Sequence, residues 1–250
     1  MDKNEINRYL AIAMDVAKRA GDYLASQILK EKIVDVDLPH DLKLQVDKRS
    51  EKIIMNYLKE RTNFSILSEE SGMLEGQEKQ FCWIVDPLDG TINYSRQIPL
   101  SAVSIGLWQG ERAVLGVIYD FNRQEMFSGV MTQGAWLNEK TIGVSSTRYK
   151  KEAVVATGFP SQTDLSLVNA QDFSKHLNEY KKIRLLGTAA LSLAYLAVGR
   201  LDGYFEKDIM LWDVAAGVAI VQAAGGQCHL NKTSRSYCYQ VKASNGLLEI

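Results

Sequence analysis

The chain has 250 residues, of which 46% are hydrophobic and 24% charged, and its formal net charge is −1. This length fits one large domain or two small ones with a substantial core, and the proportions are those of an ordinary soluble globular protein. A net charge so close to zero argues against a general nucleic-acid-binding surface, which usually needs a concentrated basic face.

The cysteines and the N-terminus indicate a cytoplasmic protein. Cys82, Cys228 and Cys238 are odd in number and have no Cys-x-x-Cys spacing, so neither a disulfide framework nor a zinc cluster is predicted. The chain is charged from Asp2 onward and lacks the apolar core of a signal peptide. No apolar run is long enough to span a bilayer, so we expect no membrane partner.

The first sixty residues are predicted to form two helices. Apolar residues recur at three- and four-residue spacing from Ile6 to Ile28, which indicates an amphipathic first helix. Residues 35–41 contain three aspartates and a proline and are predicted to be a loop. Asp47 then opens a second helix, where its charge favours the positive end of the helix dipole.

Two short apolar runs, residues 64–67 and 81–85, each end in acidic residues. The first run is followed by Ser68-Glu69-Glu70-Ser71, which suggests carboxylates at a strand end. The second is predicted to be a buried strand that a proline and a glycine stop sharply, so Asp86 and Asp89 should stand together at its end. Adjacent carboxylates repel one another unless a hard cation such as Mg²⁺ lies between them.

The residues after Asp89 suit an anionic ligand. Gly90 lets the backbone approach a ligand closely, and the amides near Thr91 can receive a phosphate if a helix begins there. The same residues are also common in plain turns, so this stretch alone leaves the turn and the metal site equally open. Asp213 adds a third acidic residue at an element boundary, although a helix cap would explain it by itself.

The remaining elements make a mixed α and β protein. Strands are predicted over residues 102–108, 112–119, 125–130 and 154–157, the first three as an antiparallel meander. Helices are predicted over residues 165–177, 189–198 and 214–224, and Gly199 fits a C-cap. The polar residues 145–152 suggest a seam within a single catalytic unit, residues 1–250, between halves 1–148 and 149–250.

Other phosphatase designs are missing from the sequence. No cysteine is followed five residues later by arginine, no Asp-x-Asp-x-Thr sequence occurs, and there is no Walker-type phosphate loop. The three histidines lie in different predicted elements. Water activated by metal ions is therefore the remaining plausible hydrolytic strategy, and carboxylates are what it requires.

Taken together, these motifs resemble the inositol monophosphatase-like family of Mg²⁺-dependent, lithium-sensitive phosphatases. The resemblance is carried, in the family's order, by residues 69–71, 86–94, 187–190, 199–204 and 212–217. It implies a layered αβαβα sandwich of the inositol monophosphatase and fructose-1,6-bisphosphatase type. It also implies a homodimer that acts on a small phosphorylated metabolite.

The resemblance further implies ligands for two or three Mg²⁺ ions, with Mn²⁺ as an alternative. The first ion would be held by Glu70, Asp86 and the carbonyl of Leu88. The second would be held by Asp86, Asp89 and Asp213, so that Asp86 bridges the two. A third, weaker ion would bind near Glu70 through water.

Catalytic and substrate roles follow from the same resemblance. The Thr91 hydroxyl, assisted by Glu70 or Asp47, would orient the attacking water, and the Gly90 and Thr91 amides would hold the phosphate. The residues implied in contacts with a polyol or sugar are Asp89, Ala189 and Glu206. Glu206 can equally be read as a solvated strand-end residue.

The chain departs from the family pattern at residues 36–46, where a lysine and a threonine are missing. The departure puts the third ion, and with it the substrate, in question. We expect a phosphatase of myo-inositol 1-phosphate or a related polyol or sugar phosphate. Histidinol phosphate, fructose 1,6-bisphosphate and 3′-phosphoadenosine 5′-phosphate remain rival substrates, and a non-enzymatic role as an accessory factor of transcription complexes is the alternative.

Overall fold

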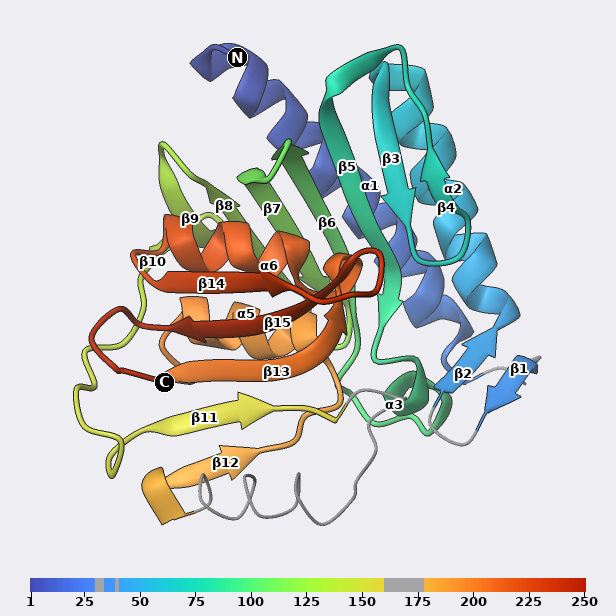
Figure 1. Cartoon of the computed structure of the whole chain (residues 1–250). Coiled ribbons are helices and arrows are strands. Elements are labelled where there is room, and N and C mark those ends of the chain that lie inside the picture. Colours follow the sequence, from blue (N-terminus) through green and yellow to red (C-terminus); the bar gives the residue numbers. More distant parts are fainter. Residues whose placement is uncertain (30–33, 39–40, 160–177) are drawn as a thin grey trace.

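Helices and sheets alternate in layers in this protein (Figure 1). A computed structural model describes residues 1–29, 34–38, 41–159 and 178–250. The helices are α1 (Lys3–Gln27), α2 (Gln45–Arg61), α3 (Thr91–Ser95), α5 (Ala189–Ala197) and α6 (Leu211–Ala223). Helices α1 and α2 cover one face of a large sheet, and α5 and α6 lie between its other face and a smaller sheet.

The large sheet has eight strands in the order β10-β9-β8-β7-β6-β5-β3-β4. Its strands are β3 (Phe64–Ser68), β4 (Gly72–Leu74), β5 (Glu78–Asp89), β6 (Ala102–Gln109), β7 (Arg112–Asp120), β8 (Glu125–Val130), β9 (Gly134–Leu137) and β10 (Lys140–Ile142). Only β3 and β5 pair in parallel; the other neighbours are antiparallel. The predicted meander is confirmed in β6, β7 and β8.

The smaller sheet has five strands in the order β12-β11-β13-β15-β14. They are β11 (Val154–Thr157), β12 (Lys182–Arg184), β13 (Gly203–Met210), β14 (Gln227–Lys232) and β15 (Cys238–Ser244). Strand β11 and the helices α1, α2, α5 and α6 confirm predictions, and Gly199 ends α5 with φ of 72°. The helix predicted over residues 165–177 lies outside the described residues.

The loop predicted over residues 35–41 is wrong for residues 35–38 and 41; residues 39–40 lie outside the described residues. The described backbone there pairs β1 (Val34–Leu38) with β2 (Asp41–Leu44) as an antiparallel hairpin. Residues 34–38 alternate apolar and acidic residues, which is the period of a strand, and the aspartates concealed this signal. None of the described helices combines the length and apolar character needed to cross a membrane.

The central strands are apolar on both faces because helices cover both faces. On β5, Trp83 and Val85 pack toward α1 and α2, whereas Ile84 belongs to the apolar cluster around α5 and α6. This arrangement explains why the strand reads as a continuous apolar run instead of alternating. The second cluster joins residues from both sides of the predicted seam at residues 145–152.

A row of glycines brings α6 unusually close to the large sheet. Gly106, Gly116 and Gly129 are direct partners across β6, β7 and β8. A Cβ atom on Gly116 would lie 2.1 Å from the carbonyl oxygen of Ala216 in α6, which is far inside van der Waals contact. Because these strands present no side chains there, α6 rests directly on the sheet and its first turn reaches the strand ends.

Replacing Gly116 by valine is expected to lower the free energy of unfolding by about 2–4 kcal/mol, because α6 must move to admit the side chain. Equilibrium denaturation in guanidinium chloride measures this change. Gly143→Ala is the matched control, since its Cβ would lie 3.7 Å from the nearest atom, the Ala224 carbonyl oxygen. An unchanged denaturation midpoint for Gly116→Val would contradict the close approach of α6.

Candidate active site

The ends of two parallel strands bring acidic residues together. Ser68 at the end of β3 pairs with Val85 of β5, and the Glu69 N–H donates to the Val85 carbonyl at 3.3 Å. Glu69 therefore lies next to Asp86. Parallel strands end at the same edge of a sheet, so the two apolar runs deliver their carboxylates to one place.

One cavity of about 570 Å³ collects five carboxylates from distant parts of the sequence. They belong to Glu69, Asp86, Asp89, Glu206 and Asp213. The wall also contains the predicted residues Leu88, Gly90, Thr91 and Ala189. The predicted meeting of Asp86, Asp89 and Asp213 is thus present in the structure.

The predicted role of Glu70 needs a correction, because the carboxylate on the cavity wall is that of Glu69. The charge of Glu69 also acts on Asp86 and Asp213, whereas Glu70 is not among the described wall residues. The physical reason is that Glu69 still pairs with β5, while Glu70 is already in the turn that leads to β4. Two consecutive glutamates at a strand end cannot be told apart without this register.

Asp47 lies near the start of α2 and is buried. Its carboxylate accepts the Leu44 N–H at 2.9 Å, so the helix-start role predicted for it is present. It is not among the described residues that line the cavity. In the same helix, the Ser50 hydroxyl donates to the Pro87 carbonyl at 2.9 Å and so holds the irregular end of β5 between Asp86 and Asp89.

Burial raises the pKa values of Asp86, Asp89 and Asp213, and repulsion from neighbouring carboxylates adds to the shift for Asp86 and Asp213. For Asp86 and Asp213 the pKa lies well above its ordinary value, first because they are buried and then because of the charge of Glu69. Burial raises the pKa of Asp89 to about 6, although hydrogen bonds to its carboxylate oppose the shift. A multivalent cation would relieve all three groups at once.

Asp89 is oriented by the first turn of α5. The Thr188 hydroxyl and the Ala190 N–H both donate to Oδ2 of Asp89, the latter at 2.8 Å. Thr188 is also the N-cap of α5, where its side chain accepts the Leu191 N–H. Sequence reasoning gave Thr188 no role in the site, yet a threonine just before an alanine-rich helix is a typical N-cap signal.

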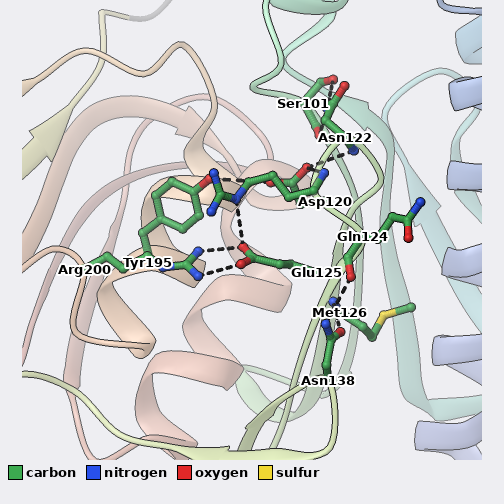
Figure 2. Close-up of polar contacts among 10 residues, drawn as sticks. Ser101, Asp120, Asn122, Gln124, Glu125, Met126, Asn138, Tyr195 and Arg200 are labelled. Atoms are coloured by element: carbon green, nitrogen blue, oxygen red, sulfur yellow. Dashed lines mark hydrogen bonds and ion pairs between the residues drawn. The ribbon is translucent and has the colours of Figure 1, made fainter.

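The opposite end of α5 is held by a polar cluster on the large sheet (Figure 2). Arg200, just beyond α5, pairs through two nitrogens with Glu125 of β8, both at 2.6 Å. The Tyr195 hydroxyl donates to the buried Asp120 at 3.5 Å, and Asp120 also accepts the Asn122 N–H at 3.0 Å. With both ends fixed, α5 holds Thr188 and Ala190 against Asp89.

Glu206 stands on the wall formed by β13. The Tyr204 hydroxyl donates to its Oε2 at 2.7 Å, and both side chains are buried. A Cβ atom on Gly158 would lie 2.3 Å from that same oxygen, so a larger residue there would force the Glu206 carboxylate to move. Burial raises the pKa of Glu206 to about 7. Glu206 is therefore not a solvated strand-end residue.

The donor set of the cavity is that of a hard-cation site. Carboxylates and the Leu88 carbonyl line it, and no histidine or cysteine is among the described wall residues, which matches the oxygen ligands that Mg²⁺ prefers. In the described ranges, however, no three acidic, histidine or cysteine side chains already stand in metal-ligand geometry. The carboxylates share one cavity and would have to turn toward a common ion to bind it.

Comparison with known proteins points to one family. The model of the Inositol monophosphatase family matches residues 5–244. A Nus factor SuhB from Pasteurella multocida is 37% identical over 225 residues, which cover 88% of this chain and 84% of the relative. An inositol-1-monophosphatase from Synechocystis is 38% identical over 226 residues, which cover 89% of this chain and 79% of the relative.

A solved structure agrees with the described architecture. The extragenic suppressor protein suhB from Bartonella henselae superimposes with a TM-score of 0.89 at 35% identity, covering 96% of this chain and 95% of that chain. The match confirms the predicted layered sandwich of the inositol monophosphatase and fructose-1,6-bisphosphatase type.

Proposed function

Because this chain belongs to the inositol monophosphatase family, we propose that it is a Mg²⁺-dependent phosphatase of a small polyol or sugar phosphate such as myo-inositol 1-phosphate. The observation that carries the proposal is the convergence of five carboxylates from distant parts of the sequence on one cavity. Asp86, Asp89 and Glu206 are buried, and the raised pKa values of Asp86, Asp89 and Asp213 support a site built for positive charge.

Proposed ligands for two ions come from the cavity wall. Glu69 replaces Glu70 in the first set, with Asp86 and the Leu88 carbonyl, and Asp86 joins Asp89 and Asp213 in the second. When bound, Mg²⁺ would supply positive charge to the phosphate and acidity to the attacking water.

The remaining chemistry falls to Gly90 and Thr91. Their amides are proposed to hold the phosphate, because Gly90 has φ of 83° and Thr91 begins α3. The Thr91 hydroxyl donates to the Leu88 carbonyl at 3.0 Å, and we propose that it turns from there to orient the water. Assistance to Thr91 from Asp47 remains part of the proposal. No cysteine or histidine stands on the described wall, and its aspartates are assigned to the ions, so we propose that water attacks directly, without a phosphoenzyme.

The test is phosphate release from a panel of phosphorylated metabolites in Mg²⁺, with and without lithium. We expect myo-inositol 1-phosphate or a related polyol or sugar phosphate to be hydrolysed, with lithium as an inhibitor. Exclusive hydrolysis of histidinol phosphate or of 3′-phosphoadenosine 5′-phosphate would replace the proposed substrate class. No release from any substrate would contradict the proposal.

Glu206→Gln is expected to lower kcat/KM for a polyol phosphate by about 10- to 100-fold, because a buried carboxylate that accepts a substrate hydroxyl is lost. Steady-state kinetics with myo-inositol 1-phosphate measure the change. Para-nitrophenyl phosphate, which has no hydroxyl groups to offer, is the control substrate and should change less. An equal loss on both substrates would show that Glu206 supports the fold or the ions instead of binding the polyol.

A homodimer is also part of the proposal. Exposed apolar side chains lie near the cavity mouth, where Ile92, Ile98 and Leu185 are 50%, 43% and 56% exposed. Hydrogen bonds from Asn93 to the carbonyls of Leu186 and Leu100 tie these segments together. Sedimentation velocity at dilute concentration should give the mass of two chains; a monomer would refute this part.

A second role is favoured by the names of relatives, since several of similar identity are called Nus factor SuhB. A function in transcription complexes would use the protein surface and would not need the carboxylates. Deleting the gene and restoring it as Asp89→Asn separates the two roles. A phenotype that the inactive variant still rescues would make the non-enzymatic role the important one.

A further inference from the structure

Arg235 is the one basic residue among the described residues that line the acidic cavity. It lies in the turn that joins β14 to β15 and is exposed. Its side chain makes no hydrogen bond or ion pair with any other described residue, whereas Lys232 in the same hairpin pairs with Glu111. A guanidinium at the mouth of a site full of carboxylates is thus available for a ligand.

The turn is fixed against the start of α6, which places Arg235 at the cavity. The Leu211 N–H, in the first turn of α6, donates to the Tyr237 carbonyl at 2.8 Å. Within the turn, the Cys238 N–H donates to the Arg235 carbonyl at 3.3 Å, and the Thr233 N–H donates to the Cys238 carbonyl at 3.0 Å. Arg235 therefore stands on a short, internally bonded turn and not on a free loop.

Arg235 and the proposed phosphate-binding amides belong to different segments of the cavity wall, the β14–β15 turn and the start of α3. Those amides are at Gly90 and Thr91, at the start of α3, and Figure 1 shows α3 well apart from the tip of the β14–β15 hairpin. The cavity of about 570 Å³ is within the range of pockets that hold whole small ligands, so it has room for a group beyond the reacting phosphate.

Charge balance makes a cation at this position useful. Five carboxylates line the cavity, so a second anionic group on the substrate meets negative charge on the wall wherever bound ions do not offset it. A cation that receives this group removes that repulsion. Arginine suits this task because its planar guanidinium binds carboxylate or phosphate oxygens in pairs.

We propose that Arg235 is a specificity-determining residue that binds a second anionic group, phosphate or carboxylate, on the phosphomonoester substrate. The proposal rests on the phosphatase function proposed above and narrows its substrate class. Polyol or sugar phosphates that carry a second negative group are preferred over those that carry only the reacting phosphate.

Two substrate pairs test the proposal, because each pair differs in the second group. Fructose 1,6-bisphosphate is compared with fructose 1-phosphate, and 3-phosphoglycerate with glycerol 1-phosphate. In at least one pair, the wild-type protein should have the higher kcat/KM for the member that carries the second anionic group. A preference in the fructose pair indicates that Arg235 binds phosphate, and a preference in the glycerol pair indicates that it binds carboxylate. Arg235→Gln should reduce that preference about tenfold or more, and Arg235→Lys should retain part of it.

Arg148→Gln is the matched control, because Arg148 is exposed and is not among the described wall residues. It removes the same charge and should leave both ratios unchanged. The proposal is overturned if Arg235→Gln lowers both members of each pair equally, which would place the guanidinium on the reacting phosphate. It is also overturned if Arg235→Gln changes nothing or if Arg148→Gln has the same effect.

A binding measurement keeps this test separate from the proposed activity. Thermal-shift titrations in Mg²⁺ give the Kd of fructose 1,6-bisphosphate and of fructose 1-phosphate without any turnover. If the wild-type protein releases phosphate from no substrate of the panel but binds the bisphosphate more tightly than fructose 1-phosphate, and Arg235→Gln removes that difference, the phosphatase function fails and the role of Arg235 stands. If hydrolysis occurs and the two Kd values and rates do not depend on Arg235, the role of Arg235 fails alone.

Discussion

Asp89→Asn is expected to reduce kcat about a thousandfold or more while leaving the fold intact. Oδ2 of Asp89 accepts the Thr188 hydroxyl and the Ala190 N–H, and these two donors fix how the side chain lies. An asparagine satisfies the same donors with its Oδ1. Its NH₂ group then takes the place of the second carboxylate oxygen, and an NH₂ group can neither ligate Mg²⁺ nor balance its charge.

The measurement is phosphate release in saturating Mg²⁺, with circular dichroism as the check on folding. Asp208→Asn is the matched control: Asp208 lies on β13, the same strand as Glu206, but is exposed and is not among the described cavity residues. Its φ of 57° is one that asparagine tolerates well, so this variant should keep nearly full activity. An Asp89→Asn protein that retained a tenth of the wild-type rate would place the chemistry elsewhere.

The acidic core of this site was accessible from the sequence because its residues stand at element boundaries. Asp86 and Asp89 end an apolar strand, and Asp213 begins a helix of small residues. That these residues share one site was implied by the family resemblance that these motifs carry. The choice between Glu69 and Glu70 could not be predicted from the sequence, because it depends on which glutamate still pairs with β5 beyond the end of β3. A shift of one residue reverses the side to which a side chain points.

Features that depend on packing between distant segments were also beyond the sequence. Gly106, Gly116 and Gly129 each look like a weak point in a strand, and their alignment under α6 exists only in the folded sheet. Strands β14 and β15 were not predicted, so Arg235 between them had no place near the site. A cavity wall assembled from six separate stretches of chain is a property of register and topology, which local patterns do not contain.

Asp86→Asn is expected to stabilise the metal-free protein at pH 8 and to remove most of its response to Mg²⁺. The pKa of Asp86 is raised well above the ordinary value of 3.8 by burial and by the charges of Glu69, Asp89 and Asp213. A carboxyl group whose pKa is higher in the folded than in the unfolded protein contributes to the free energy of unfolding at low pH. That contribution is lost as the pH rises from the unfolded-state pKa through the folded-state pKa. The ionised Asp86 side chain therefore destabilises the folded, metal-free protein at pH 8.

The amide removes this cost and keeps the hydrogen bond that Oδ1 of Asp86 accepts from the Leu88 N–H at 3.0 Å. In EDTA at pH 8, we expect Asp86→Asn to raise the free energy of unfolding by about 1–3 kcal/mol, and the difference should shrink as the pH is lowered toward 4. In Mg²⁺ at about 100 times its Kd, the wild-type protein should gain about 2.7 kcal/mol and the variant much less.

Urea denaturation of both proteins in EDTA and in Mg²⁺, each at pH 5 and pH 8, measures their free energies of unfolding and how far Mg²⁺ raises them. Asp120→Asn is the control, since burial also raises the pKa of Asp120, but it accepts the Asn122 and Arg123 amides in a turn and is not on the described cavity wall. That variant should keep the full Mg²⁺ response. Two outcomes would contradict this prediction: Asp86→Asn is less stable than the wild type in EDTA, or Mg²⁺ stabilises both proteins equally. Either outcome would show that repulsion among the buried carboxylates does not destabilise the metal-free protein in the way that a cation-binding site requires.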